Sequence, residues 1–270
     1  MAIITISRGS FSGGKLLAER LAAQLGFRCV DRDVIVERAA AYGVSHRELR
    51  DALEKPPGFL DRFQHKKYLY LTLIQAALTE EVKTGKVVYH GHAGHLLLKG
   101  AGPVFRVRII APLEFRIAMA RERLHLSREE AIRYIEKMDE DRKRWAQYLY
   151  GVDWTDPRLY DLVINLENLT IDDATDAVAH LIRRLKCFQF DAACRSTMEN
   201  LALASKVKAA LALEKATSHL EFEVEAAEGR VSIRGRVPSP DLIETVRAVA
   251  EKTPGVKEVD LSHVTTPTHA

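Results

Sequence analysis

The N-terminal stretch of residues 3–18 constrains the fold of this chain more than any other. A β-branched apolar run, Ile3 to Ile6, leads into a turn rich in glycine and serine. After the turn, apolar residues recur at helical spacing, at Leu16, Leu17, Ala18, Leu21, Ala22 and Leu25. The stretch therefore predicts a strand, a loop and a helix.

The loop fits the pattern G-x-x-x-x-G-K through Gly9, Gly14 and Lys15. Glycines let backbone N–H groups turn toward an anion, the helix N-terminus adds its positive dipole end, and the lysine can reach outer phosphates. An ordinary glycine-rich turn is the alternative. We expect a phosphate site built from Gly9, Ser10, Ser12, Gly13, Gly14, Lys15 and Leu16.

The residue after the lysine departs from the pattern. Loops of this kind carry Ser or Thr there to hold Mg²⁺, whereas this chain has Leu16. The hydroxyl of Ser10 or Ser12, an acidic side chain at a strand end, or water is left to supply the oxygen ligand. The sequence therefore leaves the identity of the Mg²⁺ ligands open.

Composition limits the class of protein. The 270 residues are 47% hydrophobic and 29% charged, which is typical of a soluble globular protein with a sizeable core. We expect neither a secretion signal nor a membrane span. The three cysteines lack metal-ligand spacing and predict reduced thiols in the cytoplasm. A net charge of +3 without a basic stripe argues against nucleic acid as a partner.

Up to about residue 186, short apolar runs alternate with helical patterns. This alternation predicts right-handed βαβ units and a five-stranded parallel sheet, with ligands bound at the carboxyl ends of the strands. Capping boxes are expected at Ser45, Ser127 and Thr170. The expected strands are residues 3–7, 28–30, 87–90, 104–111 and 161–166, and the expected helices are residues 14–25, 33–41, 59–84, 113–123, 128–149 and 171–185.

Three histidines, His90, His92 and His95, follow or end the third expected strand. Their spacing invites comparison with a metal site, but no acidic partner follows them in this run. We expect instead that one of them contacts substrate or phosphate, and that the others cap the next helix or pack in the core. His92 and His95 are the candidates for substrate binding.

Arginines are concentrated between residues 116 and 144. On a helix such charges usually form a solvated face, and acidic residues are placed to pair with many of them. In phosphoryl transfer, however, catalysis is mainly positioning and cationic stabilisation of the transferred group. A mobile helical lid that carries arginines would supply both and exclude water.

Four motifs, taken together and in their order along the chain, resemble the cytidylate kinase-like family of P-loop nucleoside monophosphate kinases. They are ITISR with SGGK at residues 4–15, VDRDVI at 30–35, DEDRKR at 139–144, and YLYGVDWTDPRLYDLVIN at 148–165. The resemblance covers residues 1–186. It implies a P-loop kinase core with an NMP-binding segment after the second strand and a helical lid, and transfer of the ATP γ-phosphoryl group, with Mg²⁺, to an acceptor such as CMP.

The resemblance also implies roles for single residues. Lys15 would hold the β- and γ-phosphates, and Arg142 and Arg144 would clamp them from the lid. Asp141 would orient one of these arginines or contact substrate. Asp31 and Asp33 would border the acceptor pocket.

Departures from the expected patterns, at Leu16, Phe11 and His92, favour a second function. Gly9 and Phe11 replace an acid and a glycine of the usual loop, and Gly91-His92 stands where these kinases usually have Gly-Arg. Histidine lacks the permanent bidentate contact of arginine. The alternative is therefore a catalytically degenerate nucleotide-binding protein that signals or docks through its C-terminal part.

Residues 196–270 have a different pattern. A helix at 196–214, strands at 220–226 and 231–235, a helix at 239–252 and a strand at 256–261 predict a small α-β-β-α-β unit after a linker at 188–197. Through VKAAL at 207–211, GRVSIRG at 229–235 and PGVKEV at 254–259, this unit resembles the BON domain. The resemblance implies a module for docking, dimerisation or ligand sensing, of a kind associated with phospholipid surfaces.

Together these observations predict two domains, a P-loop kinase-like domain at residues 1–187 and a BON-like domain at 196–270. The predicted partners are small nucleotide substrates, with neither nucleic acid nor a membrane span. The identity of the acceptor, protein or ligand docking through the C-terminal domain, and homo-oligomerisation stay open.

Overall fold

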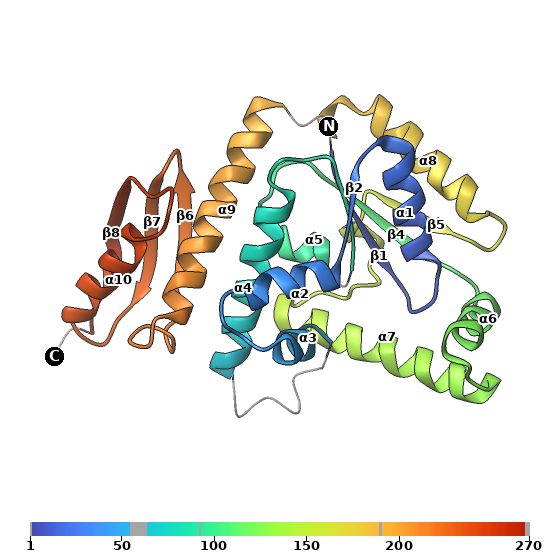
Figure 1. Cartoon of the computed structure of the whole chain (residues 1–270), viewed down its shortest axis with the longest axis horizontal. Coiled ribbons are helices and arrows are strands. Elements are labelled where there is room, and N and C mark those ends of the chain that lie inside the picture. Colours follow the sequence, from blue (N-terminus) through green and yellow to red (C-terminus); the bar gives the residue numbers. More distant parts are fainter. Residues whose placement is uncertain (1, 55–63, 92, 189–190, 268–270) are drawn as a thin grey trace.

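The computed structural model of the chain describes residues 2–54, 64–91, 93–188 and 191–267 (Figure 1). Two sheets organise these residues. The larger, N-terminal sheet has helices on both faces, and a smaller three-stranded sheet lies at the C-terminal end. Within the described ranges, no helix combines the length and apolar composition needed to cross a membrane.

The N-terminal sheet has five parallel strands in the order β2-β3-β1-β4-β5, which confirms the predicted architecture. Because β1 is central, its last residue, Arg8, lies between the ends of β3 and β4, where the loop to the first helix begins. The strands are β1 (Ile3–Arg8), β2 (Arg28–Asp31), β3 (Val87–His90), β4 (Val104–Ile110) and β5 (Leu162–Asn165).

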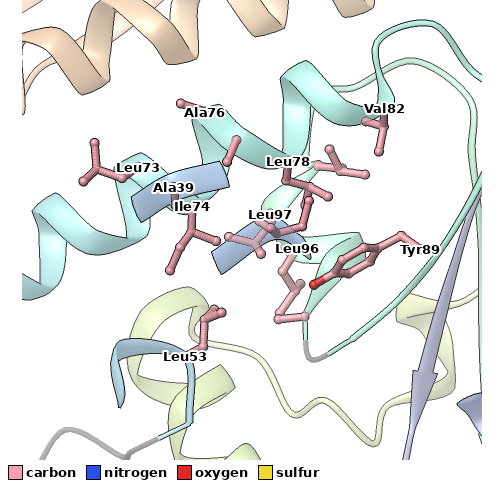
Figure 2. Packing of buried hydrophobic residues seen from close by; sticks show 14 of the residues in the cluster. Ala39, Leu53, Leu73, Ile74, Ala76, Leu78, Val82, Tyr89, Leu96 and Leu97 are labelled. Atoms are coloured by element: carbon pink, nitrogen blue, oxygen red, sulfur yellow. The ribbon is translucent and has the colours of Figure 1, made fainter. Parts of the chain in front are cut away.

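The two faces of this sheet belong to two separate apolar cores. Alternation along β1 places Ile3 in one core and Ile4 and Ile6 in the other. Helices α1 (Gly14–Leu25) and α8 (Ile171–Arg184) cover the second face. The first is covered by α2 (Arg32–Ala40), α3 (His46–Glu54), α4 (Gln64–Val82) and the short α5 (Gly94–Leu97). Figure 2 shows side chains of α4 and α5 packed together in this first core.

Helices α6 (Leu113–Leu124) and α7 (Arg128–Tyr150) form the predicted helical hairpin. The capping boxes at Ser127 and Thr170 are both confirmed, with the Oγ of Ser127 accepting from the N–H of Glu130. At its far end, α7 returns to the first core, where the buried indole of Trp145 donates to the carbonyl of Ala52. The hairpin therefore joins the sheet edge to the segment that follows β2.

The C-terminal unit has the predicted α-β-β-α-β order. Strand β6 (Glu223–Ala227) pairs antiparallel with β7 (Arg230–Arg236), which pairs parallel with β8 (Glu258–Thr265). Helices α9 (Ala192–Leu213) and α10 (Asp241–Glu251) complete it. Two short 3₁₀ turns, Pro157–Leu159 and Lys186–Phe188, flank β5 and α8.

Helix α9 differs from the prediction, because it begins at Ala192 and takes up most of the expected linker at 188–197. It runs along α4 (Figure 1). Met198 and Ala209 belong to the first core of the N-terminal unit, whereas Val207 and Leu211 belong to the C-terminal core. One helix thus serves two cores.

The expected helix at 59–84 corresponds in its described part to α4, and residues 55–63 lie outside the described residues. Tyr70 is buried in the first core. The hydroxyl of Tyr68 instead lies 3.4 Å from both the backbone N and O of Phe222 in the C-terminal unit, and Lys208 of α9 lies over its ring.

Candidate active site

The loop between β1 and α1 needs glycine at two positions. Gly13 has a φ of +80°, and a Cβ there would lie 2.5 Å from Cδ1 of Ile171. At Gly14 a Cβ would lie 2.3 Å from Cδ of Arg8. Phe11 adopts a φ of 60° without being glycine. These positions let the chain turn sharply and direct the N-terminus of α1 toward the carboxyl edge of the sheet.

A cavity of about 280 Å³ lies over this loop. It is bounded by the carboxyl ends of β1, β2 and β3 and by the helical hairpin. The wall thus combines the loop with residues that are far apart in the sequence. Its lining residues are Ser7, Arg8, Ser10, Phe11, Gly13, Gly14, Lys15, Asp31, Arg32, Asp33, His90, Gly91, Met119, Arg123, Tyr134, Met138 and Arg142.

Four arginines converge on this cavity, one from β1, one from α2 and two from the hairpin. They are Arg8, Arg32, Arg123 and Arg142. Burial, together with the charges of the other three, lowers the pKa of Arg8 to about 10. Burial likewise lowers the pKa of Arg142, although the nearby Asp139 acts in the opposite direction. Cations held together in this way favour an anion between them.

Lys15 lies in the first turn of α1 and lines the same cavity. Its side chain is 50% exposed, and Nζ lies 3.7 Å from Oε1 of Glu19 in the next turn. An exposed ion pair at this distance stabilises little, so the ammonium group can turn from Glu19 to a bound phosphate at small cost.

Asp139 of α7 holds the loop to the hairpin. Its Oδ1 accepts hydrogen bonds from the backbone N and the Oγ of Ser10, at 3.0 Å and 3.1 Å. Arg116 of α6 pairs with the same carboxylate and donates from Nε to the carbonyl of Ser10 at 2.7 Å. Arg142 donates to the carbonyl of Arg8 at 3.2 Å. We call Ser10, Arg116 and Asp139 the loop clasp.

The tip of the loop contacts the hairpin through apolar groups as well. The rings of Phe11 and Tyr134 lie 5.9 Å apart, and Phe11 packs against a small buried cluster inside the hairpin. The cluster consists of Ile117, Ala120, Ala131 and Ile135. Phe11, where the family usually has glycine, therefore anchors the loop tip to the hairpin and leaves the cavity unfilled.

At the β2 side of the cavity, Asp31 caps α2 by accepting from the N–H of Val34 at 2.9 Å. Asp33 lies 3.2 Å from Arg50 of α3. His90 ends β3 beside Asp31, and its Nδ1 lies 3.5 Å from Nη2 of Arg8. Burial and then the Arg8 charge lower the pKa of His90 to about 4, so its ring is neutral at neutral pH.

The structure brings some of the predicted site residues together and leaves others apart. Ser10, Gly13, Gly14, Lys15, Asp31, Asp33 and Arg142 line the cavity. Gly9 and Ser12 lie on the other side of the loop, where the Ser12 hydroxyl donates to the carbonyl of Gly9 at 2.8 Å. The side chain of Leu16 is half-buried in α1, outside the cavity lining.

Three further candidates lie away from the cavity lining. Arg144 is 62% exposed and pairs with Glu140, and Asp141 is not part of the wall. His95 is buried against the ring of Tyr160, at 4.8 Å between centroids, and burial lowers its pKa to about 4. His92 lies outside the described residues. Among those residues, no three potential metal ligands gather.

Sequence reasoning did not identify Arg8 or Arg32 as site residues, and it treated Arg116 and Arg123 only as members of the arginine-rich hairpin. It also missed a second hollow of about 490 Å³ on the β4 side of the loop. There the buried Arg108 lies 4.2 Å from the centre of the Trp154 ring and donates to the Trp154 carbonyl at 2.7 Å. The spacing of Asp139 and Arg142, three residues apart on one helix face, was the available signal for α7.

Comparisons with known proteins agree with this architecture. The cytidylate kinase-like family matches residues 3–168, and the BON domain matches residues 200–265. A cytidylate kinase of Ignicoccus hospitalis is 29% identical over 188 residues, which cover 68% of this chain and 99% of that protein. A cytidylate kinase of Pyrococcus horikoshii is 30% identical over 165 residues, or 60% of this chain and 79% of that protein.

A solved structure has the same fold over the N-terminal unit. It is an uncharacterized protein from Eubacterium ventriosum, with a TM-score of 0.55 and 20% identity, covering 68% of this chain and 99% of that chain. At this identity the likeness concerns the fold alone. The family match, by contrast, spans more than half of the sequence and includes the loop, the cavity wall and the hairpin. On that match, this chain belongs to the cytidylate kinase-like family.

Proposed function

We propose that this protein transfers the γ-phosphoryl group of ATP to a nucleoside monophosphate, CMP or a closely related acceptor. The cavity over the loop carries this proposal, because it joins the glycine-rich turn and Lys15 to four arginines and to two carboxylates, Asp31 at the end of β2 and Asp33 in the first turn of α2. Relatives named cytidylate kinase match two thirds of the chain, which supports the same reaction class.

In this reaction an oxygen of the acceptor phosphate attacks the γ-phosphorus of ATP, and the bond from that phosphorus to the β–γ bridging oxygen breaks. ADP leaves with the bond electrons. Because the protein contributes little covalent chemistry, its residues act by position and charge. The loop amides and Lys15 hold the polyphosphate, while Arg123 and Arg142 neutralise charge from the hairpin.

The protein oxygens on the cavity wall suit a metal that is bound mainly by phosphate and water. They include the carboxylates of Asp31 and Asp33, which would hold Mg²⁺ beside the phosphates, and the Ser10 hydroxyl, which would do so only after leaving the Asp139 carboxylate. The Ser12 hydroxyl is engaged with the Gly9 carbonyl. When bound, Mg²⁺ supplies further neutralisation of phosphate charge.

A phosphoryl-transfer assay with ATP and a panel of nucleosides and nucleoside monophosphates tests the proposal. We expect transfer to CMP or a related monophosphate, and a loss of about 100-fold or more in Lys15→Ala. The exposed Lys99→Ala is the matched control and should retain activity. No transfer to any acceptor, or transfer unaffected by Lys15→Ala, would contradict the proposal.

A second function, nucleotide binding without turnover, is supported by Leu16 in place of a hydroxyl residue and by the Asp139 carboxylate on the Ser10 N–H. In this case the C-terminal unit, which contacts α4 through Tyr68 and Phe222, would transmit the nucleotide state to a partner. Calorimetry on the full chain separates the two functions. Binding of ATP or CMP without product formation favours the second.

A further inference from the structure

The arginine that ends β1, Arg8, lines the cavity and packs closely against the loop. Its aliphatic stem packs over the first turn of α1, where a Cβ added to Gly14 would lie 2.3 Å from Cδ and 2.9 Å from Cβ of Arg8. Its carbonyl accepts a hydrogen bond from Arg142. Both the backbone and the stem of Arg8 are thus in contact with neighbouring residues, and the residue lines the cavity.

This guanidinium makes few contacts inside the protein. Its buried Nε has no hydrogen-bond partner among the residues that the structure describes. Nη2 has only a long contact, 3.5 Å, with Nδ1 of His90. By comparison, Arg142 on the same wall and Arg116 on the other side of the loop share the carboxylate of Asp139. Within the described part of the chain, no carboxylate lies within ion-pair distance of Arg8.

An arginine in this state is costly without a ligand. A buried N–H without an acceptor loses its hydrogen bonds to water, and neighbouring cations add repulsion. Arg142, Arg32 and Arg123 all contribute to that repulsion. Such an arrangement persists where an anion completes it during function.

The direction of Arg8 indicates which anion this is. The loop amides and Lys15 surround the place for the donor polyphosphate, on the α1 side. Arg8 instead approaches His90, which pairs in register with Ile6 of β1 and with Asp31 of β2. Asp31 lies opposite His90 in the sheet, and Asp33 follows it in the first turn of α2. If the loop binds ATP on the α1 side, the side near His90 is left for the phosphoryl acceptor.

We propose that Arg8 binds the phosphate group of the acceptor, a phosphate monoester, and so selects phosphorylated acceptors over nucleosides. The inference rests on the proposed phosphotransferase function and assigns one of its binding residues. A planar guanidinium with a buried, unpartnered Nε suits two-point contact with phosphate oxygens. The neutral His90 ring accepts from Nη2 and orients the group without competing for the anion.

Calorimetry and steady-state kinetics on the full chain test this inference. The variants are Arg8→Gln, which removes the charge, and Arg8→Lys, which keeps the charge but loses the planar donor group. Arg20→Gln is the control, because Arg20 lies on α1, pairs with Asp172 and lines no described cavity. CMP, cytidine and ATP are titrated into each protein, and far-UV circular dichroism verifies folding.

We expect Arg8→Gln to weaken CMP binding and raise the KM for CMP by about 10- to 100-fold, while the affinity and KM for ATP change less than about threefold. Cytidine binding should stay unchanged, so the preference for CMP over cytidine disappears. Arg8→Lys should lie between the wild type and Arg8→Gln. If ATP binding falls instead of CMP binding, or if neither falls in a folded variant, the assignment is wrong.

The experiment also distinguishes an error in this inference from an error in the proposed function. If the wild-type chain binds no CMP, inorganic phosphate is titrated in its place. Phosphate binding that is lost in Arg8→Gln would then retain the anion site and reject CMP as the acceptor. If the wild-type chain binds neither CMP nor phosphate, both the inference and the proposed function are wrong.

Discussion

Asp139 accepts hydrogen bonds from both the backbone N–H and the hydroxyl of Ser10, 129 residues earlier in the chain. Through this carboxylate, helix α7 is hydrogen-bonded to the loop between β1 and α1. Arg116 completes the loop clasp by bonding to the same carboxylate and to the carbonyl of Ser10. Hydrogen bonds and an ion pair therefore connect the loop to the hairpin in this structure.

Removing the carboxylate of the clasp should destabilise the protein. Asp139→Ala leaves the largely buried Arg116 without its ion pair and removes two acceptor contacts with Ser10, so we expect a loss of about 2–4 kcal/mol in the free energy of unfolding. Urea denaturation measures it. Glu140→Ala, which removes an exposed pair with Arg144, should cost no more than about 0.5 kcal/mol. If Asp139→Ala lowers the free energy of unfolding as little as Glu140→Ala does, the loop clasp does not stabilise the fold.

Gly13 and Gly43 offer a matched pair for the loop. Both have strongly positive φ values, +80° and +86°, but a Cβ at Gly13 would lie 2.5 Å from Ile171, whereas a Cβ at Gly43 has nothing within 4 Å. Alanine should cost about 1–2 kcal/mol at either position through backbone strain, and up to about 1 kcal/mol more at Gly13, where the terminal methyl of Ile171 must shift.

The nucleotide affinity of these two variants separates loop geometry from general stability. Gly13→Ala should weaken ATP binding by about tenfold or more, because the loop amides move, and Gly43→Ala should leave ATP binding unchanged. Calorimetry with ATP measures both. ATP affinity that is insensitive to Gly13→Ala would mean that this turn does not hold the polyphosphate.

Much of the N-terminal unit could be predicted from the sequence because the information there is local. The β-branched run at residues 3–6 determined the central strand, and the capping boxes at Ser127 and Thr170 marked two helix starts. The loop pattern located the cavity wall through Gly14 and Lys15. These signals depend only on neighbours a few residues apart.

The remaining site residues depend on contacts between distant elements. Helical geometry explains why the two predicted lid arginines are separated in this structure. Residues two apart on a helix face different sides, so Arg142 lines the cavity and Arg144 pairs with Glu140 away from it. The same spacing separates Asp139, which reaches Ser10, from Asp141, which lines neither cavity next to the loop. The convergence of Arg8 with the hairpin arginines has no local signal, because it arises from the strand order.

Two buried histidines should make stability depend on pH. Burial lowers the folded-state pKa of His90 and of His95 from 6.5 to about 4. Below pH 6.5 the unfolded chain therefore binds protons that the folded chain does not, so stability is complete above about pH 6.5 and falls as the pH drops toward 4. At about 1.4 kcal/mol per pH unit, each histidine contributes at most about 3 kcal/mol.

His95→Gln tests the pH dependence with little effect on the cavity, because His95 lies against Tyr160 and outside the cavity lining. The slope of unfolding free energy against pH between 4 and 6.5 should decrease by up to about 1.4 kcal/mol per pH unit. His180→Gln, at an exposed position of α8, should keep the wild-type slope. Urea denaturation at a series of pH values gives these slopes, and an unchanged slope in His95→Gln would refute the assignment.

The sharing of α9 between two cores makes a prediction about the whole chain. Met198 is fully buried in the core of the N-terminal unit, although it comes after all strands of that unit. The two tryptophans, Trp145 and Trp154, both belong to the N-terminal unit, so their fluorescence reports its unfolding. Met198→Ala should lower the stability seen by tryptophan fluorescence by about 2–4 kcal/mol, because it leaves a cavity in that core.

A control on the same helix separates core packing from helix propensity. Leu213, at the end of α9, is 38% exposed, so Leu213→Ala should cost less than about 1 kcal/mol by the same measurement. If α9 were only the first helix of an independent C-terminal domain, Met198→Ala would leave the tryptophan transition unchanged. A shift of that transition would mean that docking of the C-terminal unit and stability of α4 are linked, since α4 is the helix that α9 covers.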